Sequence, residues 1–242
     1  MKRAVVTGAA GGMGRATCAL LLDRGFSVLA IDSHEERLSR LDDELREYPL
    51  LSAHLDLSTP DLGERFEELL QHHEWSTVFG LVNLAGLSAG DELERLSDEA
   101  WASSMQVNAT APMVLSRGCI ARMRRHGEGS IVNVSSPVGV IGARKPSYAA
   151  SKAALLGLTM STARTGGAER IRANLLLPGA TITNMTDDWP QDKRDKIAEG
   201  SFLKRLCTPE EVAAVIAFLL SDDASYMTGS VVDMTAGSMF GH

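Results

Sequence analysis

The chain has 242 residues, 44% of them hydrophobic, which is enough for one sizeable core. A net charge of −7, without any block of basic residues, argues against nucleic acid or an anionic membrane as a partner. No apolar run approaches the ~18–20 residues of a bilayer-spanning helix.

The cysteines and histidines indicate neither disulfides nor a metal site. Cys18, Cys119 and Cys207 lack Cys-x-x-Cys spacing, and we interpret them as reduced thiols of a cytoplasmic protein. The six histidines show no metal-ligand spacing, so no metal is expected. The N-terminal residues enter a predicted strand at once, and we therefore expect no signal peptide.

Strand and helix patterns alternate along the whole chain without a linker. The predicted strands cover residues 3–7, 27–31, 50–55, 78–83, 130–135, 171–176 and 230–234. The predicted helices cover residues 13–24, 35–47, 60–73, 97–126, 147–165 and 209–220. This order predicts an α/β fold with a doubly wound, seven-stranded parallel sheet and helices on both faces, in one domain spanning residues 1–242.

A glycine-rich turn follows the first predicted strand, with glycines at positions 8, 11, 12 and 14. A strand, such a turn and a helix present backbone N–H groups and a helix N-terminus to a pyrophosphate. The spacing is Gly-x-x-x-Gly-x-Gly, which differs from the usual dinucleotide fingerprint. Glycines can also serve only to reverse a chain, but the position at the first strand–helix junction favours phosphate binding.

The second predicted strand ends at Asp32, about where a dinucleotide fold places an acidic residue on the adenosine ribose. A carboxylate there accepts hydrogen bonds from ribose hydroxyls and repels a 2′-phosphate. Ser33 and His34 follow, without an adjacent Arg or Lys. The sequence therefore predicts NAD as the cofactor, with NADP less favoured. The alternative role for Asp32 is a cap for the helix that begins near Glu35.

Tyr148 and Lys152 lie four residues apart in a predicted helix, with Ser136 upstream. Residues four apart share a helix face, and an ammonium near a phenol favours the phenolate, whose ordinary pKa is about 10. Such a pair suits a general acid–base that moves a proton on or off an alcohol oxygen. The Tyr-x-x-x-Lys pattern also occurs by chance, so the rest of the chain must support it.

An ordered set of motifs extends over nearly the whole chain. Its members are Thr7-Gly8-x-x-x-Gly12-x-Gly14, Asp56-Leu57, Asn83-Leu84-Ala85-Gly86, Asn108, Ser136, Tyr148-x-x-x-Lys152, Pro178-Gly179 and Thr183. In this order they resemble the short-chain dehydrogenase/reductase family in its single-domain branch. The resemblance implies a Rossmann fold and an oxidoreductase that acts on CH–OH groups with a nicotinamide cofactor.

The resemblance also implies a catalytic set of Asn108, Ser136, Tyr148 and Lys152. Tyr148 would donate the proton in reduction and accept it in oxidation. Lys152 would lower the pKa of Tyr148 and bind the nicotinamide ribose, and Ser136 would hold the reacting oxygen. Asn108 would order a water chain behind Lys152. Ser135 competes with Ser136, but Ser136 better matches the family's Ser-x-x-Gly register.

By the same resemblance, further residues would contact the cofactor along its length. The complete predicted set is Gly8, Gly12, Met13, Gly14, Asp32, Asp56, Leu57, Asn83, Ala85, Gly86, Tyr148, Lys152, Pro178, Gly179, Thr181 and Thr183. Asp56 and Leu57 would lie by the adenine. Asn83, Ala85 and Gly86 would follow the adenosine ribose. Pro178, Gly179, Thr181 and Thr183 would border the nicotinamide.

The least regular segment, residues 183–206, has mixed charges together with Met185, Trp189 and Phe202. It fits a substrate lid, although an ordinary surface loop is the alternative. The apolar stretch after Ser136, residues 138–141, favours a substrate with a hydrophobic or alicyclic body. Arg144 and Lys145 are interpreted as solvated charges.

Three functions follow from these expectations. The first is an NAD-dependent alcohol dehydrogenase of steroid, dihydrodiol or small cyclic alcohol type. The second is an NADPH-dependent reductase of the 3-oxoacyl-carrier-protein type, which would need a basic carrier-binding patch that the sequence does not show. The third is a dinucleotide-sensing regulator without turnover, which would not need the proton-transfer set. The family also implies a homotetramer or homodimer.

Overall fold

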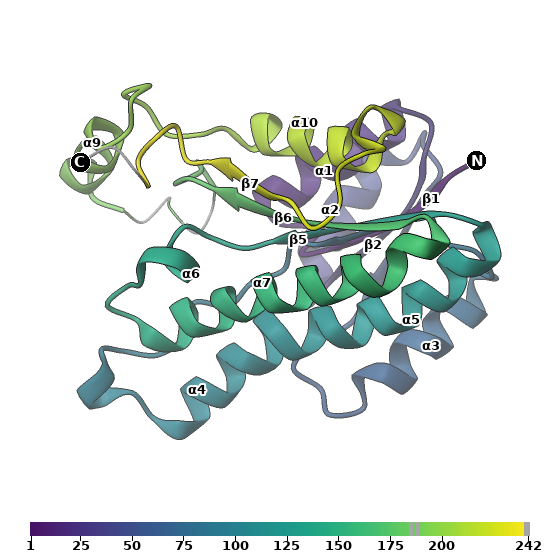
Figure 1. The fold of residues 1–242 in the computed structure, drawn as a ribbon, viewed down its shortest axis with the longest axis horizontal. Helices are drawn as coiled ribbons and strands as arrows, with labels where there is room; N and C mark the ends of the chain where they lie inside the picture. The colour runs from purple at the N-terminus through teal and green to yellow at the C-terminus, as the bar shows by residue number, and fades with distance from the viewer. Residues whose placement is uncertain (184–185, 187–188, 240–242) are drawn as a thin grey trace.

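The computed structural model describes residues 1–183, 186 and 189–239. Seven parallel strands form one sheet in the order β3-β2-β1-β4-β5-β6-β7 (Figure 1). The strands are β1 (Arg3–Thr7), β2 (Ser27–Asp32), β3 (Leu50–His54), β4 (Gly80–Asn83), β5 (Gly129–Val134), β6 (Ile171–Pro178) and β7 (Val231–Met234). The predicted doubly wound sheet is thereby confirmed.

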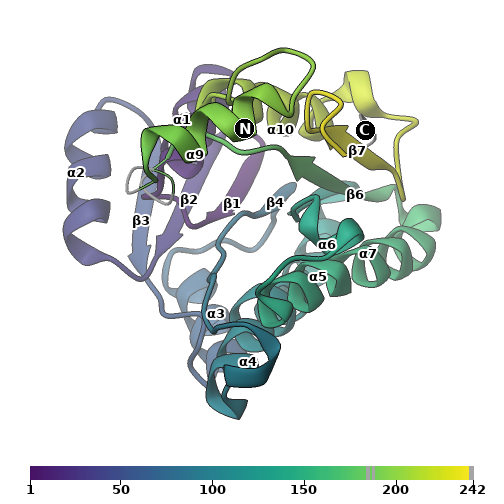
Figure 2. The ribbon, with the colours of Figure 1, turned by 90° about the vertical axis from the view of Figure 1, so that its left-hand side faces the viewer.

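Helices cover both faces of the sheet, as Figures 1 and 2 show from two directions. One layer contains α1 (Gly12–Asp23), α2 (Glu35–Leu45) and α10 (Pro209–Leu220). The other contains α3 (Leu62–His72), α4 (Asp98–Met105), α5 (Ala111–His126) and α7 (Pro146–Gly166). Shorter elements are α6 (Val138–Ile141), α9 (Gln191–Glu199), the 3₁₀ turns Leu93–Arg95, Gly167–Glu169 and Asp222–Ala224, and the π-helical segment η2 (Gln106–Thr110).

Alternation along the strands divides the core into two apolar clusters. In β1, Ala4 and Val6 face the cluster that contains α1 and α10 residues, whereas Val5 faces the cluster that contains α3 and α5 residues. Successive side chains of a strand point to opposite faces, and strands covered on both faces become continuously apolar. This is why β1, β2 and β4 read as unbroken hydrophobic runs.

The structure corrects two sequence expectations about helices. The single helix expected over 97–126 is α4 and α5 joined through the π-helical segment η2. The segment 183–206 contains the helix α9, which has no buried residue. Its sequence therefore lacks the apolar periodicity that would have predicted a helix. Its turns are held by polar pairs such as the Gln191 Nε2 to Asp195 Oδ1 hydrogen bond of 2.7 Å.

The strand order reverses between β1 and β4, which pair side by side. In open α/β sheets, ligands bind beyond the carboxyl ends of the strands at this switch point. The glycine-rich turn after β1 and residues 84–87 after β4 both begin at this edge. None of the helices within the described ranges is long and apolar enough to cross a bilayer.

Candidate active site

The glycine-rich turn lies directly against the loop that follows β4. Gly8 has a φ of +65°, and a Cβ atom there would stand 2.8 Å from the Ala85 Cα. At Gly14 a Cβ atom would come within 2.1 Å of the Gly8 carbonyl oxygen. Both positions therefore require glycine, the first for its conformation as well.

Helix α1 begins at Gly12 with Gly11 as its N-cap, and no side chain caps it. The N–H groups of its first turn have no intrahelical partner and face the edge of the sheet where the turn lies. An uncapped helix N-terminus on a glycine turn binds phosphate groups through these N–H groups and the helix dipole. The turn therefore fits the pyrophosphate of a dinucleotide.

Asp32 connects this turn to the loop after β2. Its Oδ2 accepts a hydrogen bond from the Ala10 N–H at 3.0 Å, and its Oδ1 accepts one from the His34 N–H at 3.1 Å. The N-cap of α2 is His34, so Asp32 does not cap that helix. The carboxylate lies at the turn, where it can also meet a ribose.

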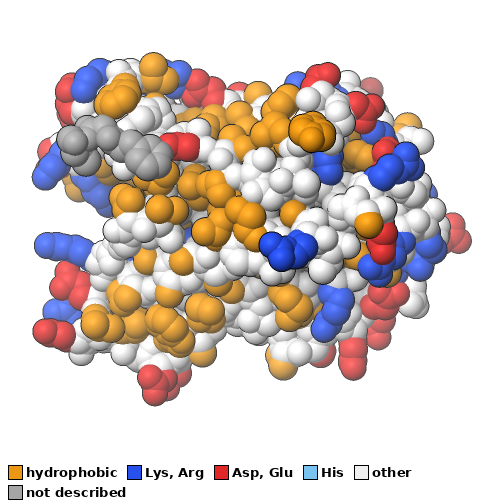
Figure 3. Space-filling model, in the orientation of Figure 1, with side chains coloured by type: hydrophobic (Ala, Val, Ile, Leu, Met, Phe, Trp, Pro, Cys, Tyr) orange, Lys and Arg blue, Asp and Glu red, His pale blue; other side chains and the backbone are white. Residues whose placement is uncertain are grey.

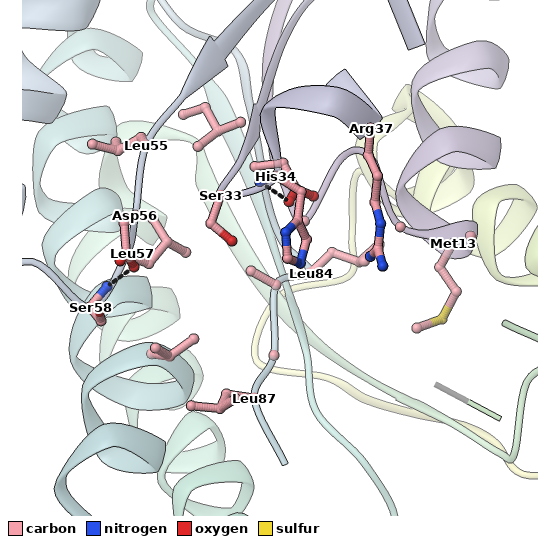
Figure 4. Close-up of a pocket in the computed structure, with 18 of the residues that line it drawn as sticks. Met13, Ser33, His34, Arg37, Leu55, Asp56, Leu57, Ser58, Leu84 and Leu87 are labelled. Atoms are coloured by element: carbon pink, nitrogen blue, oxygen red, sulfur yellow. Dashed lines mark hydrogen bonds between the residues drawn. The ribbon is translucent and has the colours of Figure 1, made fainter. Parts of the chain in front are cut away.

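A cavity of about 390 Å³ extends from the turn along the ends of β2, β3 and β4 (Figure 4). Small-molecule and cofactor pockets have volumes of this order. Its lining includes nine residues of the predicted cofactor set: Gly8, Gly12, Met13, Asp32, Asp56, Leu57, Ala85, Gly86 and Thr183. Residues distant in sequence thus converge as the resemblance implied.

Other members of the predicted set lie outside this cavity. Asn83 is buried, and its Nδ2 donates to the Asn133 Oδ1 at 2.8 Å in the core. Pro178 ends β6, and Gly179 lines a smaller pocket of about 140 Å³ next to α9. Thr181 is buried, and its backbone forms an isolated parallel β-bridge with that of Cys207.

Sequence reasoning missed several residues that line the cavity: Gly11, Ile31, Ser33, His34, Arg37, Leu55, Ser58, Leu84, Leu87 and Val107. Arg37 matters most because it brings a cation to a wall that we expected to lack one. It lies three residues after His34, and both side chains are seen beside the same part of the cavity (Figure 4). Helical spacing in α2 could have found it, since residues three apart share a face.

Tyr148 and Lys152 occupy the first two turns of α7, and Ser136 follows the end of β5. Ser136 is hydrogen-bonded to the Tyr148 side chain. Ser135, the competing residue, is buried and donates through its hydroxyl to the Lys152 carbonyl at 2.8 Å. Ser136 therefore provides the hydroxyl beside the phenol, and Ser135 anchors the helix.

Burial is the main influence on the pKa values of Tyr148 and Lys152. Burial raises the pKa of Tyr148 above its ordinary value, and the hydrogen bond with Ser136 opposes this increase. Burial lowers the pKa of Lys152 to about 8. The Lys152 Nζ donates to the Val134 carbonyl at 2.9 Å and lies 5.9 Å from the centre of the Tyr148 ring. The lowering of the Tyr148 pKa by Lys152 stays a prediction.

The Lys152 ammonium group nonetheless lies close to the wall of the cofactor cavity. A Cβ atom placed on Gly86, which lines the cavity, would lie 3.3 Å from the Lys152 Nζ. The lysine therefore stands where the dinucleotide cavity and the Tyr148 side chain adjoin. This is the position from which one ammonium can serve both a ribose and a phenol.

Asn108 is buried in the π-helical segment η2. Its Nδ2 donates to the Leu87 carbonyl at 2.8 Å and to the Ser151 Oγ at 2.9 Å, and its Oδ1 accepts from the Leu87 N–H at 2.7 Å. Single π turns within helices are frequent at functional sites. The side chain joins the cavity wall to α7, and the expected ordering of a water chain stays a prediction.

Comparison with known proteins places this geometry in a family. The family model described as "Enoyl-(Acyl carrier protein) reductase" matches residues 8–238. A 3-oxoacyl-acyl-carrier-protein reductase of Thermotoga maritima is 35% identical over 98% of this chain and 97% of its own length. The chain belongs to the short-chain dehydrogenase/reductase family.

Further relatives differ in their named substrates. A human (3R)-3-hydroxyacyl-CoA dehydrogenase is 35% identical, covering 97% of this chain and 94% of its own. The solved structure of a 4-hydroxyisoleucine dehydrogenase complexed with NADH covers all of both chains with a TM-score of 0.93 at 29% identity. This member of the family is therefore an NAD(P)-dependent oxidoreductase that acts on CH–OH groups.

Proposed function

We propose that this protein interconverts a secondary alcohol and a ketone with an apolar body, with NAD as the preferred cofactor. The observation that supports the proposal is the position of the Lys152 ammonium, which lies beside Gly86 of the cavity wall and 5.9 Å from the centre of the Tyr148 ring. Tyr148 is in turn hydrogen-bonded with Ser136. A dinucleotide sensor without turnover has no use for this arrangement. In this proposal residues 1–242 form one domain, residues 183–206 act as its lid, and the assembly is a homotetramer or homodimer.

Tyr148 would hold and move the proton of the reacting oxygen, and Ser136 would fix that oxygen by a hydrogen bond. The nicotinamide supplies the hydride chemistry when bound. Lys152, whose pKa is lowered to about 8 by burial, is cationic at neutral pH and would stabilise a phenolate as it forms. The chain thereby contributes orientation and proton transfer.

The preference for NAD rests on Asp32. Its carboxylate is held at the end of β2 by two backbone N–H groups and lines the cavity. A fixed negative charge there favours ribose hydroxyls over a 2′-phosphate. Arg37 opposes this preference in part, so we expect measurable but weaker use of NADP.

The apolar side chains near the site support a hydrophobic substrate body. Val140 and Ile141 in α6, which follows Ser136, are 57% and 63% exposed, and Phe202 beyond α9 is 66% exposed. Figure 3 shows apolar side chains around the hollow between the α9 region and the side that carries α6 and α7. Of the predicted lid residues, Met185 lies outside the described part of the chain.

The charges around this region do not favour an acidic carrier protein. Arg144 pairs with Glu92 at 3.5 Å, Lys204 with Glu199 at 3.8 Å, and Arg205 with Glu211 at 2.5 Å. In Figure 3, Lys and Arg side chains lie among Asp and Glu side chains, mainly at the margins of the face. We therefore favour a free alcohol or a 3-hydroxyacyl-CoA thioester over a substrate bound to a carrier protein, an inference that the (3R)-3-hydroxyacyl-CoA dehydrogenase relative also supports.

The test is NADH formation from a panel of 3-hydroxyacyl-CoA thioesters, steroid alcohols, dihydrodiols and cyclic alcohols, repeated with NADP. We expect turnover of at least one class, and Tyr148→Phe should lower kcat by about 100-fold or more because it removes the acid–base. Binding of NADH by the Tyr148→Phe variant should persist. Tight cofactor binding without turnover of any alcohol or ketone would instead favour the sensor.

A further inference from the structure

Helix α7 carries a second pair of residues four apart, Ser147 and Ser151, one position before Tyr148 and Lys152. Adjacent residues of a helix are rotated by about 100°, so the two pairs form neighbouring stripes. Both serines are completely buried. The tyrosine and lysine are held next to the cofactor cavity, whereas the serines face the loop that follows β4 and the segment around Asn108.

The two serines fasten α7 to this loop by hydrogen bonds. The Ser147 Oγ donates to the Ala89 carbonyl at 2.9 Å. The Ser151 Oγ donates to the Tyr148 carbonyl at 2.9 Å and accepts from the Asn108 Nδ2 at 2.9 Å. Ser151 is therefore the contact through which the Asn108 amide reaches the turn of α7 that carries Tyr148.

The Asn108 side-chain amide also forms hydrogen bonds with the cavity wall. Its Nδ2 and Oδ1 bond the carbonyl and the N–H of Leu87, which lines the dinucleotide cavity with Ala85 and Gly86. An amide nitrogen has two hydrogens, and here Leu87 and Ser151 each take one. The same side chain thus fixes the distance between the cofactor wall and α7.

We propose that Ser151, assisted by Ser147, is a positioning residue that sets the rotation of α7 relative to the cofactor wall. The inference rests on the proposed function, since its consequence is the alignment of Tyr148 with a substrate beside the nicotinamide. Without the Ser151 hydroxyl, the Asn108 Nδ2 loses a buried partner and the first turns of α7 lose their link to Leu87. An acid–base displaced by ~1 Å can cost up to ~100-fold in rate.

The experiment compares Ser151→Ala with Ser130→Ala. Ser130 is also completely buried and donates to a backbone carbonyl, that of Leu219 at 2.9 Å, but it is the second residue of β5, near the amino end of that strand and away from the site. Both variants lose one buried hydroxyl, and their thermal midpoints should fall by similar amounts. Only Ser151→Ala should lose kcat, on the order of 10- to 100-fold, with KM changing less.

A pH measurement separates positioning from stability. A displaced Tyr148 loses its hydrogen bond with Ser136, which opposes the effect of burial, so its pKa should rise. The alkaline shift should appear in the rate profile of Ser151→Ala and not in that of Ser130→Ala. The same shift should appear in a titration of tyrosinate absorbance. Subtracting the titration curve of a Tyr148→Phe variant removes the contributions of Tyr48 and Tyr226, the other two tyrosines.

The absorbance titration needs no substrate, so the two proposals fail separately. If the wild-type protein oxidises nothing, the proposed function fails while the titration still tests the role of Ser151. If Ser151→Ala does not fold, Ser147→Ala should show the same alkaline shift with a smaller loss of kcat. A rate and a titration equal to those of Ser130→Ala, for whichever serine variant folds, overturn the inference.

Discussion

Arg37 lines the same cavity as Asp32, and Figure 4 shows its side chain beside that of His34. None of the salt bridges among the described residues involves Arg37. An arginine near the end of the second strand accommodates the 2′-phosphate of NADP. Under the proposed function, Asp32 would reject this phosphate and Arg37, in the same pocket, would attract it.

Replacement of Arg37 by Ala should weaken NADP binding and leave NAD binding nearly unchanged. Charge-assisted hydrogen bonds contribute ~1.5–3 kcal/mol, so the Kd for NADPH should rise roughly 10- to 100-fold. Cofactor fluorescence titrations measure both constants. Arg40→Ala, on the same helix but outside the cavity lining, is the control. Equal NADPH affinity in the two variants would remove Arg37 from the cofactor site.

At the scale of elements, the alignment of the site depends on how closely α6 packs against α7. A Cβ atom on Gly139 would lie 2.9 Å from both the Ala153 nitrogen and the Lys152 carbonyl carbon. These are backbone atoms, which cannot move aside without moving the helix. Gly139 therefore lets the segment that carries Ser136 approach the turn that carries Lys152.

Gly139→Ala should push α6 away from α7 and lower kcat on the order of 10-fold or more, since Ser136 moves with α6. Gly157→Ala is the matched control on α7, because a Cβ atom there meets nothing within 4 Å. It should keep its activity and gain ~0.5–1 kcal/mol, as Ala is the better helix former. Retained kcat in Gly139→Ala would show that this contact does not align Ser136.

At the scale of the whole molecule, one buried cation connects α3 to α5. Arg122 has a side chain only 5% exposed, and it forms a two-pronged pair with Glu67, with its NH2 2.7 Å from the Oε1. It also donates to the Trp75 and Gly118 carbonyls. The hydrogen bonds from Arg122 lower the pKa of Glu67 from 4.5 to about 2.

A carboxyl group with a lowered pKa stabilises the fold above its unfolded pKa, and this stabilisation is lost as the pH falls toward the folded value. Glu67→Gln should thus lower the free energy of unfolding by about 1 kcal/mol at neutral pH. This value is modest because the Glu67 side chain is 45% exposed and water screens the ion pair. The deficit should shrink below pH 4.5. Urea unfolding at several pH values measures it, with the exposed Glu68→Gln as control; a deficit independent of pH would contradict the argument.

The sequence by itself determined the order of elements and the sheet, because alternating periodicity is a local property of the chain. The family resemblance of its motifs supplied nine of the nineteen residues that line the cavity. The sequence also placed Tyr148 and Lys152 on one helix face, since that follows from helical geometry. Arg37, Ser151 and Gly139 emerged only from tertiary structure. Their importance depends on which distant backbone atoms, Leu87 and Lys152 among them, come within contact distance. The pKa values of Tyr148 and Lys152 were likewise decided by burial, which no spacing along the chain reveals.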